Sequence, residues 1–239
     1  GDITAIAQGS AGRVWYGTDD NGVLGYSGPL ASLKVSAMAY TKDGSLWVGS
    51  PQNGLTRIKD GTARIYSVAR DSTHRMMIDD HINALATDKS GNLWVATDGG
   101  LQIYNPRMDQ FSNYTKENGK IKTNNLTSLF YAKGNKMLIG TSEGLIIMDI
   151  SSTKKDYYTG NATNLKKFTN NYVTQVFEDS RGLIWVGTRE GVNILNLDPD
   201  ANTLDQLTER KHNLCNNNIC GIAEDRNRNI WLTTSNGVS

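Results

Sequence analysis

"GLIWVGTREG", residues 182–191, decides the fold of this chain because closely related stretches recur five more times along it. At the corresponding places stand "GRVWYGTDDNG", "GSLWVGSPQNG", "GNLWVATDGG", "NKMLIGTSEG" and "RNIWLTTSNG". Each stretch reads as a turn, a dense apolar strand and a second turn. Such a unit, used six times, indicates a repeat architecture before it indicates any chemistry.

The spacing inside the repeat is constant. A Trp, or Leu in the fourth repeat, stands twelve residues after an aliphatic residue, giving the pairs Ile3–Trp15, Val35–Trp47, Ile82–Trp94, Leu126–Leu138, Val173–Trp185 and Ile219–Trp231. The aliphatic members are 32, 47, 44, 47 and 46 residues apart. Hairpins joined by outer loops of variable length would give this pattern, so we expect repeats to begin near residues 3, 35, 82, 126, 173 and 219.

Each repeat is predicted to hold up to four strands. In the fifth repeat these are residues 173–179, 183–188 and 192–197, and a looser fourth strand follows in most repeats, such as 63–69 or 110–116. Runs rich in Val, Ile, Tyr and Trp between Gly, Asn and Asp turns are typical of an antiparallel meander. Helical periodicity is absent over any useful length, which predicts an all-β chain.

The second strand of the repeat separates a sandwich from a propeller. A strand with one wet face alternates apolar and polar residues, whereas residues 183–186 and 93–95 are apolar without alternation. Both faces must then be buried, as they are when small sheets stack radially. Gly187 and its equivalents Gly17, Gly49 and Gly140 would let adjacent sheets approach closely. We therefore predict that residues 1–239 form one β-propeller domain, or an arc of one, with about six four-stranded repeats.

Two repeats are irregular. The first is about a dozen residues short, so that residues 23–34 leave little room for a fourth strand, and the last stops at "NGVS" where its third strand should begin. The chain also begins with Gly1 rather than Met. We expect it to be a fragment of a larger propeller region in a longer protein.

Composition excludes several classes of protein. The 239 residues carry a net charge of +1, which argues against electrostatic nucleic-acid binding. No apolar run approaches the roughly 20 residues of a membrane helix. The two cysteines, Cys215 and Cys220, are expected to be free and partly buried thiols, with a local disulfide as the alternative in an oxidising compartment.

The repeat residues resemble the two-component regulator propeller repeat of hybrid two-component sensors, the kind abundant in gut Bacteroidetes. The fifth repeat carries the resemblance on Asn171, Val173, Val176, Glu178, Asp179, Gly182, Ile184, Trp185, Gly187, Thr188 and Gly191. The third carries it on Ile82, Leu85, Asp88, Gly91, Leu93, Trp94, Thr97 and Gly100. All six repeats match to some degree, with departures at Ala96, Asn135, Leu138, Arg228 and Thr233.

The resemblance implies a periplasmic, non-catalytic sensor segment without a cofactor. In such proteins propellers precede a β-sandwich, a membrane helix, a histidine kinase, a receiver and a DNA-binding module. The implied ligand is an oligosaccharide from a glycan. The full-length sensor would be a homodimer tethered to the membrane through parts outside this chain, and this segment would not contact nucleic acid itself.

Catalytic motifs have plain structural interpretations. Residues 140–144 spell G-x-S-x-G, but a nucleophile elbow needs a strand, turn and helix around Ser142, and this serine is predicted to lie in a hairpin turn. The acidic residues Asp88, Glu178–Asp179 and Glu224–Asp225 recur with the repeat, so they are expected to cap turns rather than to cleave glycosides. His74, His81 and His212 share no ligand spacing, and we expect no metal site and no catalytic residue.

Polar residues gather where the chain enters the first strand of several repeats, in residues 78–82, 122–126, 169–173 and 215–219. In a propeller these lead-in loops share a face with the turns between the second and third strands. A ring of amides, carboxylates and one arginine, with nearby aromatic residues such as Tyr172, suits sugar hydroxyls. The predicted ligand-binding residues are Asp98, Asn124, Asn125, Asn170, Asn171, Tyr172, Arg189, Glu190, Asn217 and Asn236.

Two other functions stay open at this point. A propeller enzyme, such as a polysaccharide or streptogramin lyase, has similar Trp-containing repeats but would need a His with an acid or metal partner. A protein-interaction scaffold would be favoured if the lead-in face bound no sugar.

Overall fold

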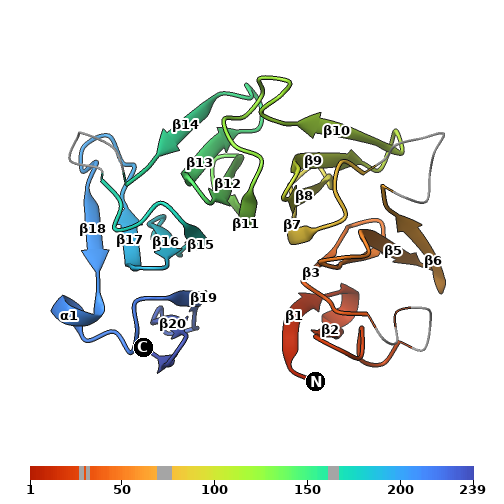
Figure 1. Ribbon diagram of the computed structural model, residues 1–239, viewed down its shortest axis with the longest axis horizontal. Coiled ribbons are helices and arrows are strands. Elements are labelled where there is room, and N and C mark those ends of the chain that lie inside the picture. Colours follow the sequence, from red (N-terminus) through yellow and green to blue (C-terminus); the bar gives the residue numbers. More distant parts are fainter. Residues whose placement is uncertain (27–29, 31–32, 69–76, 161–166) are drawn as a thin grey trace. The chain divides into compact units, whose positions relative to one another are not determined.

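The computed structural model describes residues 1–26, 30, 33–68, 77–160 and 167–239, and their regular secondary structure consists almost entirely of antiparallel β-sheets joined by turns and loops (Figure 1). The chain forms two compact units, Gly1–Leu126 and Thr127–Ser239. We call the sheet of each repeat a blade and number the blades along the chain. The predicted all-β propeller class is confirmed by this architecture and by the solved structures it resembles, which are described below.

The N-terminal unit contains the first three blades. Blade 1 pairs β1 (Ile3–Gln8) with β2 (Val14–Thr18), with a single 3-10 turn, η1 (Ser10–Gly12), between them. Blade 2 has the order β3 (Ala37–Tyr40), β4 (Leu46–Gly49), β5 (Leu55–Lys59), β6 (Thr62–Tyr66). Blade 3 has β7 (Ile82–Thr87), β8 (Leu93–Thr97), β9 (Gly100–Asn105) and β10 (Gln110–Tyr114) in sequential order.

The C-terminal unit holds the remaining blades. Blade 4 consists of β11 (Leu126–Ala132), β12 (Lys136–Thr141), β13 (Gly144–Asp149) and β14 (Lys155–Tyr158). Blade 5 consists of β15 (Val173–Glu178), β16 (Ile184–Thr188), β17 (Gly191–Leu195) and β18 (Leu204–Leu207). Blade 6 consists of β19 (Ile219–Glu224), β20 (Ile230–Thr234) and the short β21 (Gly237–Val238).

The structure corrects two details of the sequence prediction. Blade 1 lacks more than a fourth strand, because among its described residues the third strand is reduced to one isolated bridge between Gly17 and Val23. A four-residue helix, α1 (Glu209–His212), precedes blade 6 in a chain that was predicted to contain none. The incomplete third strand of blade 6 agrees with the prediction.

The second strands of blades 2, 3 and 5 are buried on both faces, as their unbroken apolar sequence predicts, whereas β2 and β20 of blades 1 and 6 keep exposed residues. Every residue of β4, β8 and β16 is buried. In blade 2 the indole of Trp47 packs on blade 3, where its ring centroid lies 4.9 Å from that of Tyr104. In blade 5 the equivalent Trp185 packs on Ile219 and Leu232 of blade 6. The repeated tryptophan is therefore the residue that joins a blade to its successor within each unit.

The repeated glycine of the second strand makes the close approach that was predicted for it. A Cβ atom at Gly49 would lie 2.5 Å from Cγ2 of Ile82, the first residue of the next blade. A Cβ atom at Gly187 would likewise lie 2.7 Å from Cγ2 of Ile219. Neighbouring blades therefore interlock through a notch in one strand and a branched side chain in the next.

A hydrogen bond that the sequence did not predict runs beside this notch. In three blades the residue after the first aliphatic position donates its side-chain hydroxyl to the backbone carbonyl of the aliphatic residue in the next blade, whereas the hydroxyl of Thr174 in blade 5 is buried with no partner among the described residues. Thr4 donates to Val35 and Thr127 to Val173, each at 2.6 Å, and Ser36 donates to Ile82. These contacts satisfy carbonyl groups that would otherwise be buried without a partner between sheets.

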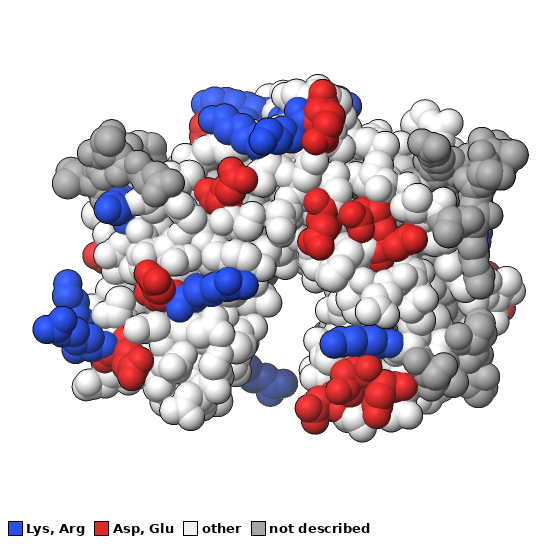
Figure 2. Space-filling view, in the orientation of Figure 1, with Lys and Arg blue, Asp and Glu red and all other residues white. Residues whose placement is uncertain are grey.

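Surface charge agrees with the near-neutral composition. Among the described residues on the face shown in Figure 2, acidic and basic side chains form small separate groups without a continuous basic patch. In the part of the chain that the structure describes, no helix is long and apolar enough to cross a membrane.

Candidate functional site

The turn between the second and third strands is closed by a threonine. In blade 5, Thr188 donates from Oγ1 to the carbonyl of Gly191 at 2.8 Å and accepts the N–H of Glu190 at 3.1 Å. This pair of bonds turns the side chains of Arg189 and Glu190 outward, and both residues are exposed. The sequence therefore presents two charged groups at the tip of a rigid hairpin.

The same closure explains the G-x-S-x-G motif of blade 4. Thr141 donates to the carbonyl of Gly144 at 2.8 Å and accepts the N–H of Glu143 at 3.0 Å. Ser142 lies in the resulting turn between β12 and β13, with a strand where a nucleophile elbow would need a helix. The predicted hairpin-turn interpretation of Ser142 is confirmed.

Lead-in loops lie against these turns, as the meander predicts. In the C-terminal unit the N–H of Gly191 donates to the carbonyl of Asn217, in the lead-in loop of blade 6, at 2.8 Å. In the N-terminal unit the N–H of Gly54 donates to the carbonyl of Asp80 at 3.1 Å. We call the surface formed by the lead-in loops and the turns between second and third strands the lead-in face.

Blade 5 brings two of the predicted ligand-binding residues together. The guanidinium carbon of Arg189 lies 3.6 Å from the centroid of the Tyr172 ring. Asn170 accepts the N–H of Tyr172 on its side-chain oxygen at 2.7 Å, and Asn171 accepts the N–H of Gly160 at 2.5 Å. Both asparagines therefore shape the loop that holds the ring. Among the described residues no carboxylate forms an ion pair with Arg189.

Blade 6 contributes two further amide groups to the lead-in face. Asn217 accepts the N–H of Glu209 on its side-chain oxygen at 2.7 Å, which leaves its NH₂ group as a donor. Asn236 is exposed at the tip of the turn that Thr234 closes. Seven of the ten predicted residues, from Asn170 to Asn236, thus belong to the C-terminal unit.

The three predicted residues of the N-terminal unit, Asp98, Asn124 and Asn125, do not share one cluster of hydrogen bonds among the described residues. Asp98 accepts the side-chain amide of Asn83 at 2.8 Å, and its other oxygen lies 3.6 Å from Nδ1 of His81. Asn124 accepts the N–H of Lys116 at 2.7 Å and donates to both oxygens of the Glu117 carboxylate. Its side chain therefore holds a local loop.

Asn125 is exposed and makes no side-chain hydrogen bond with the described residues. The pairing of His81 with Asp98 was not predicted, because the histidines had been read as scattered. Both side chains of that pair are about half exposed.

The recurring aspartates cap turns, as predicted. Asp179 is 1% exposed, and its carboxylate accepts the N–H of Leu183 at 2.9 Å and the indole N–H of Trp185 at 3.0 Å. Asp88 and Asp225 make the same two contacts in their blades. These carboxylates are occupied by the fold, which confirms the structural interpretation over glycoside cleavage.

The glutamates beside them join blades. Glu224 accepts the N–H and the hydroxyl of Ser180 at 2.8 and 2.7 Å, and Glu178 accepts the N–H of Lys133 at 2.8 Å. Each contact links the first hairpin of one blade to that of its neighbour within the C-terminal unit.

Hydrogen bonding lowers the pKa of several of these carboxyl groups. Bonds from Asn229 and Trp231 lower the pKa of Asp225 to about 2. Burial raises the pKa of Asp179, but the bonds from Trp185 and Arg181 outweigh it and bring the pKa below its ordinary value. Burial likewise opposes ionisation of Asp43, and hydrogen bonds from Thr41, Ser45 and Arg57 hold its pKa well below the usual range.

Acid is therefore expected to destabilise the chain below about pH 4. A carboxyl whose pKa is lower in the folded state contributes stability that is present above its unfolded pKa, about 4. That stability is lost as the pH falls through the folded pKa, which is about 2 for Asp225. Urea unfolding should give a free energy that drops between about pH 4 and pH 2. The drop should be smaller in Asp225→Asn, and a level profile in the parent chain would contradict the assignment.

Cysteine and histidine chemistry is sparse. Cys215 and Cys220 are free, as predicted, but both are exposed, so the expectation of partial burial is wrong. Nδ1 of His212 accepts the N–H of Thr208 at 3.2 Å, and His74 lies outside the described residues. Among the described residues no group of three or more His, Cys, Asp or Glu side chains could hold a metal ion.

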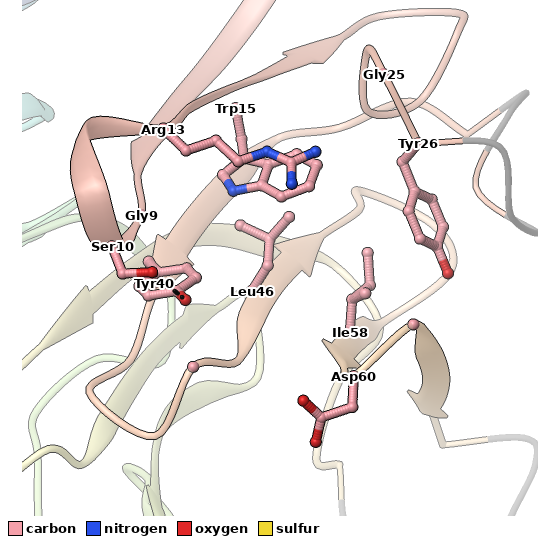
Figure 3. A pocket seen from close by; sticks show the side chains of 12 residues that line it. Gly9, Ser10, Arg13, Trp15, Gly25, Tyr26, Tyr40, Leu46, Ile58 and Asp60 are labelled. Atoms are coloured by element: carbon pink, nitrogen blue, oxygen red, sulfur yellow. Dashed lines mark hydrogen bonds between the residues drawn. The ribbon is translucent and has the colours of Figure 1, made fainter.

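Sequence reasoning missed a hollow in the N-terminal unit, lined in part by Arg13 and Trp15 (Figure 3). The signal that could have revealed it is Gly9, which stands six residues before Trp15, where Asp88, Asp179 and Asp225 stand before their tryptophans.

Comparison with known proteins defines the fold and then the repeat. The extracellular domain of the putative hybrid two component system BT3049 from B. thetaiotaomicron matches with a TM-score of 0.70 at 16% identity, over 99% of this chain and 39% of that one. The corresponding domain of BT4673 from the same organism gives 0.70 at 19%, over 99% and 37%. Virginiamycin B lyase from Staphylococcus aureus gives 0.70 at 11%, over 99% and 83%. At these identities the likeness shows the fold, that of a β-propeller.

The repeats themselves are recognised in the sequence. Residues 76–99, 167–190 and 213–236 match the two component regulator propeller family. The predicted resemblance is therefore confirmed: the chain carries two-component regulator propeller repeats. It spans under two fifths of the length of the two extracellular domains named above. No curated protein matches the sequence.

Proposed function

We propose that this chain is a ligand-sensing segment from the extracytoplasmic part of a hybrid two-component sensor. It lies in the periplasm, performs no catalysis, and passes binding of an oligosaccharide to a histidine kinase outside this chain. The matched repeats and the likeness to extracellular domains of hybrid two component systems support the proposal. The full-length sensor is proposed to be a homodimer tethered to the membrane through parts outside this chain, without nucleic-acid contact by this segment.

The proposed ligand site is the lead-in face of the C-terminal unit. The observation that carries it is the stack of Arg189 on Tyr172, 3.6 Å from guanidinium carbon to ring centroid, in the hairpin whose Gly191 donates its N–H to the backbone carbonyl of Asn217. Stacking holds the guanidinium in place while its N–H groups stay available. Fixed N–H donors, amide groups and the carboxylate of Glu190 match the alternating donor and acceptor capacity of sugar hydroxyls.

A thermal-shift screen against defined oligosaccharides tests this proposal. A sugar that binds the folded chain raises its unfolding temperature, with a stabilisation of about 2.7 kcal/mol at a hundred times its Kd. Arg189→Ala is expected to weaken the binding of that sugar by about tenfold or more, since hydrogen bonds to a charged group are worth about 1.5–3 kcal/mol.

Arg226→Ala is the matched control. Arg226 is an exposed arginine of the same unit, but it lies in the turn between the first and second strands, at the other end of the sheet. Its replacement should leave binding unchanged. Equal losses in both variants, or no response to any sugar, would overturn the proposed site, and the second result would favour a protein-interaction scaffold.

A propeller lyase is the second candidate function. The likeness to virginiamycin B lyase and the pairing of His81 with Asp98 favour it, because a lyase needs a His with an acidic partner. Mass spectrometry of the stabilising sugar after long incubation separates the two candidates. An intact sugar supports the sensor, whereas cleavage that disappears in His81→Ala would replace the sensor with a lyase.

A further inference from the structure

A hollow of about 400 Å³ lies between the first two blades of the N-terminal unit (Figure 3). Its size falls in the range of roughly 300–1,000 Å³ that is usual for small-molecule sites. Residues that line it include Arg13, Trp15 and Tyr26 from blade 1 and its following loop, and Tyr40, Leu46 and Asp60 from blade 2.

The hollow belongs to the opposite end of the strands from the lead-in face. Its rim includes Ser10, in the turn between the first and second strands of blade 1. It also includes Gly61, in the turn between the third and fourth strands of blade 2. The hollow is therefore distinct from the oligosaccharide site proposed above.

Arg13 lines this hollow, and its exposed side chain has no carboxylate partner among the described residues. Its guanidinium carbon is 3.7 Å from the centroid of the Trp15 ring, and Figure 3 shows the group stacked over the indole. Among the described residues no acidic side chain forms an ion pair with it. The stacking orders the guanidinium before any ligand arrives, which reduces the entropy lost on binding.

Complete blades of the same chain show what is missing beside Arg13. In blade 2, Arg57 stands over Trp47 and donates to the carboxylate of Asp43 at 2.6 Å. In blade 5, Arg181 donates to the carboxylate of Asp179 at 2.6 Å, and the same oxygen accepts the indole N–H of the blade's tryptophan. An arginine beside the repeated tryptophan is thus held by a carboxylate in both blades.

Blade 1 has glycine at the position that carries the carboxylate in blade 5, whereas blade 2 has Thr41 at that position and takes its carboxylate from Asp43. Gly9 occupies the position of Asp179, and the indole N–H of Trp15 is buried with no acceptor among the described residues. The arginine and the tryptophan of the arrangement are present, while its carboxylate is absent.

We propose that the hollow binds a sugar acid, whose carboxylate lies beside Arg13 in the manner of the aspartates in other blades. An arginine holds a carboxylate through two parallel N–H bonds. The rings of Tyr26 and Tyr40 and the side chain of Leu46 supply an apolar wall for the sugar ring. Asp60 lies at the other end of the hollow from Arg13 in Figure 3. Its carboxylate would accept a hydrogen bond from a hydroxyl group of the sugar ring.

D-galacturonate and D-galactose form the decisive pair of probes, because they differ only at C6, which is a carboxylate in the first and a hydroxymethyl group in the second. Each sugar is titrated into the intact chain at up to millimolar concentration. The NMR shifts of the tryptophan indole N–H groups then report binding. D-galacturonate is expected to shift the Trp15 signal and to bind at least about tenfold more tightly than D-galactose, the value of a charged hydrogen bond.

Two variants test the role of Arg13. Arg13→Ala should weaken the binding of D-galacturonate by about 10- to 100-fold. Gly9→Asp should supply the missing carboxylate from the chain itself, so it should also abolish binding while keeping or raising the unfolding temperature. The backbone at Gly9 is extended, and an added Cβ meets its nearest neighbour, Nε1 of Trp15, at 3.3 Å.

Loss of binding with retained stability in Gly9→Asp cannot be attributed to misfolding. Arg189→Ala should leave D-galacturonate binding unchanged, so this site and the lead-in face succeed or fail separately. Equal binding of D-galactose, absence of binding by both sugars, or full binding by Gly9→Asp would each overturn the proposal.

Discussion

Replacing Asp179 with alanine is expected to lower the free energy of unfolding by about 2–4 kcal/mol, because buried donors lose their acceptor. The carboxylate accepts the indole N–H of Trp185 and the backbone N–H groups of Arg181 and Leu183. Trp185 is 7% exposed, so water cannot replace the bond to its indole without repacking. Urea unfolding followed by tryptophan fluorescence measures the loss.

Blade 4 supplies a natural control for this prediction. There Ala132 and Leu138 stand where blades 3, 5 and 6 have Asp and Trp, so neither the acceptor nor the indole donor is present. Combining Asp179→Ala with Trp185→Leu should therefore destabilise the chain by less than the sum of the single changes, with a coupling of about 1–3 kcal/mol. Single effects that add to within about 0.5 kcal/mol would show that the two residues contribute independently.

Replacing Gly49 with alanine is expected to cost about 1–3 kcal/mol by overpacking the notch between blades 2 and 3. The new Cβ would lie 2.5 Å from Cγ2 and 2.9 Å from Cβ of Ile82, which is itself fully buried. Gly49 is not among the residues with positive φ, so the loss comes from contact with Ile82 rather than from backbone strain.

Gly9→Ala is the matched control for that change. The backbone at Gly9 is also ordinary, with φ at −89°, and an added methyl group meets its nearest neighbours at 3.3 Å and beyond. Its effect on the free energy of unfolding should stay within about 1 kcal/mol. A Gly49 variant as stable as this control would show that the blades separate enough to admit a methyl group, and the notch would not be specific to glycine.

The blades could be predicted because their signals are local. Burial of both faces of β16 follows from four consecutive apolar residues, Leu183 to Val186, and the Thr188 turn follows from its own sequence. The extent of blade 1 was harder to predict. A missing third strand leaves no residue pattern of its own, and one bridge at Val23 is all that the described residues keep of it.

The candidate sites could be predicted only as regions. The meander brings lead-in loops beside the turns between second and third strands, so the neighbourhood of Asn217 and Gly191 was expected. The stack of Arg189 on Tyr172 and the approach of His81 to Asp98 were not, because they depend on the directions of side chains from different strands.

The sequence by itself determined the repeat, its strands, the glycine notches and the aspartates that cap the turns. Each of these was recognised from residues within one repeat, where unbroken apolar runs between turns and a fixed spacing of twelve mark equivalent positions. Only the tertiary structure decided that Arg13 lines a hollow and has no carboxylate partner there among the described residues. Blade 1 has Gly9 where blades 3, 5 and 6 have Asp, and the side chains of Tyr40 and Asp60 that line the hollow come from blade 2. Contacts between repeats depend on packing that no single segment encodes.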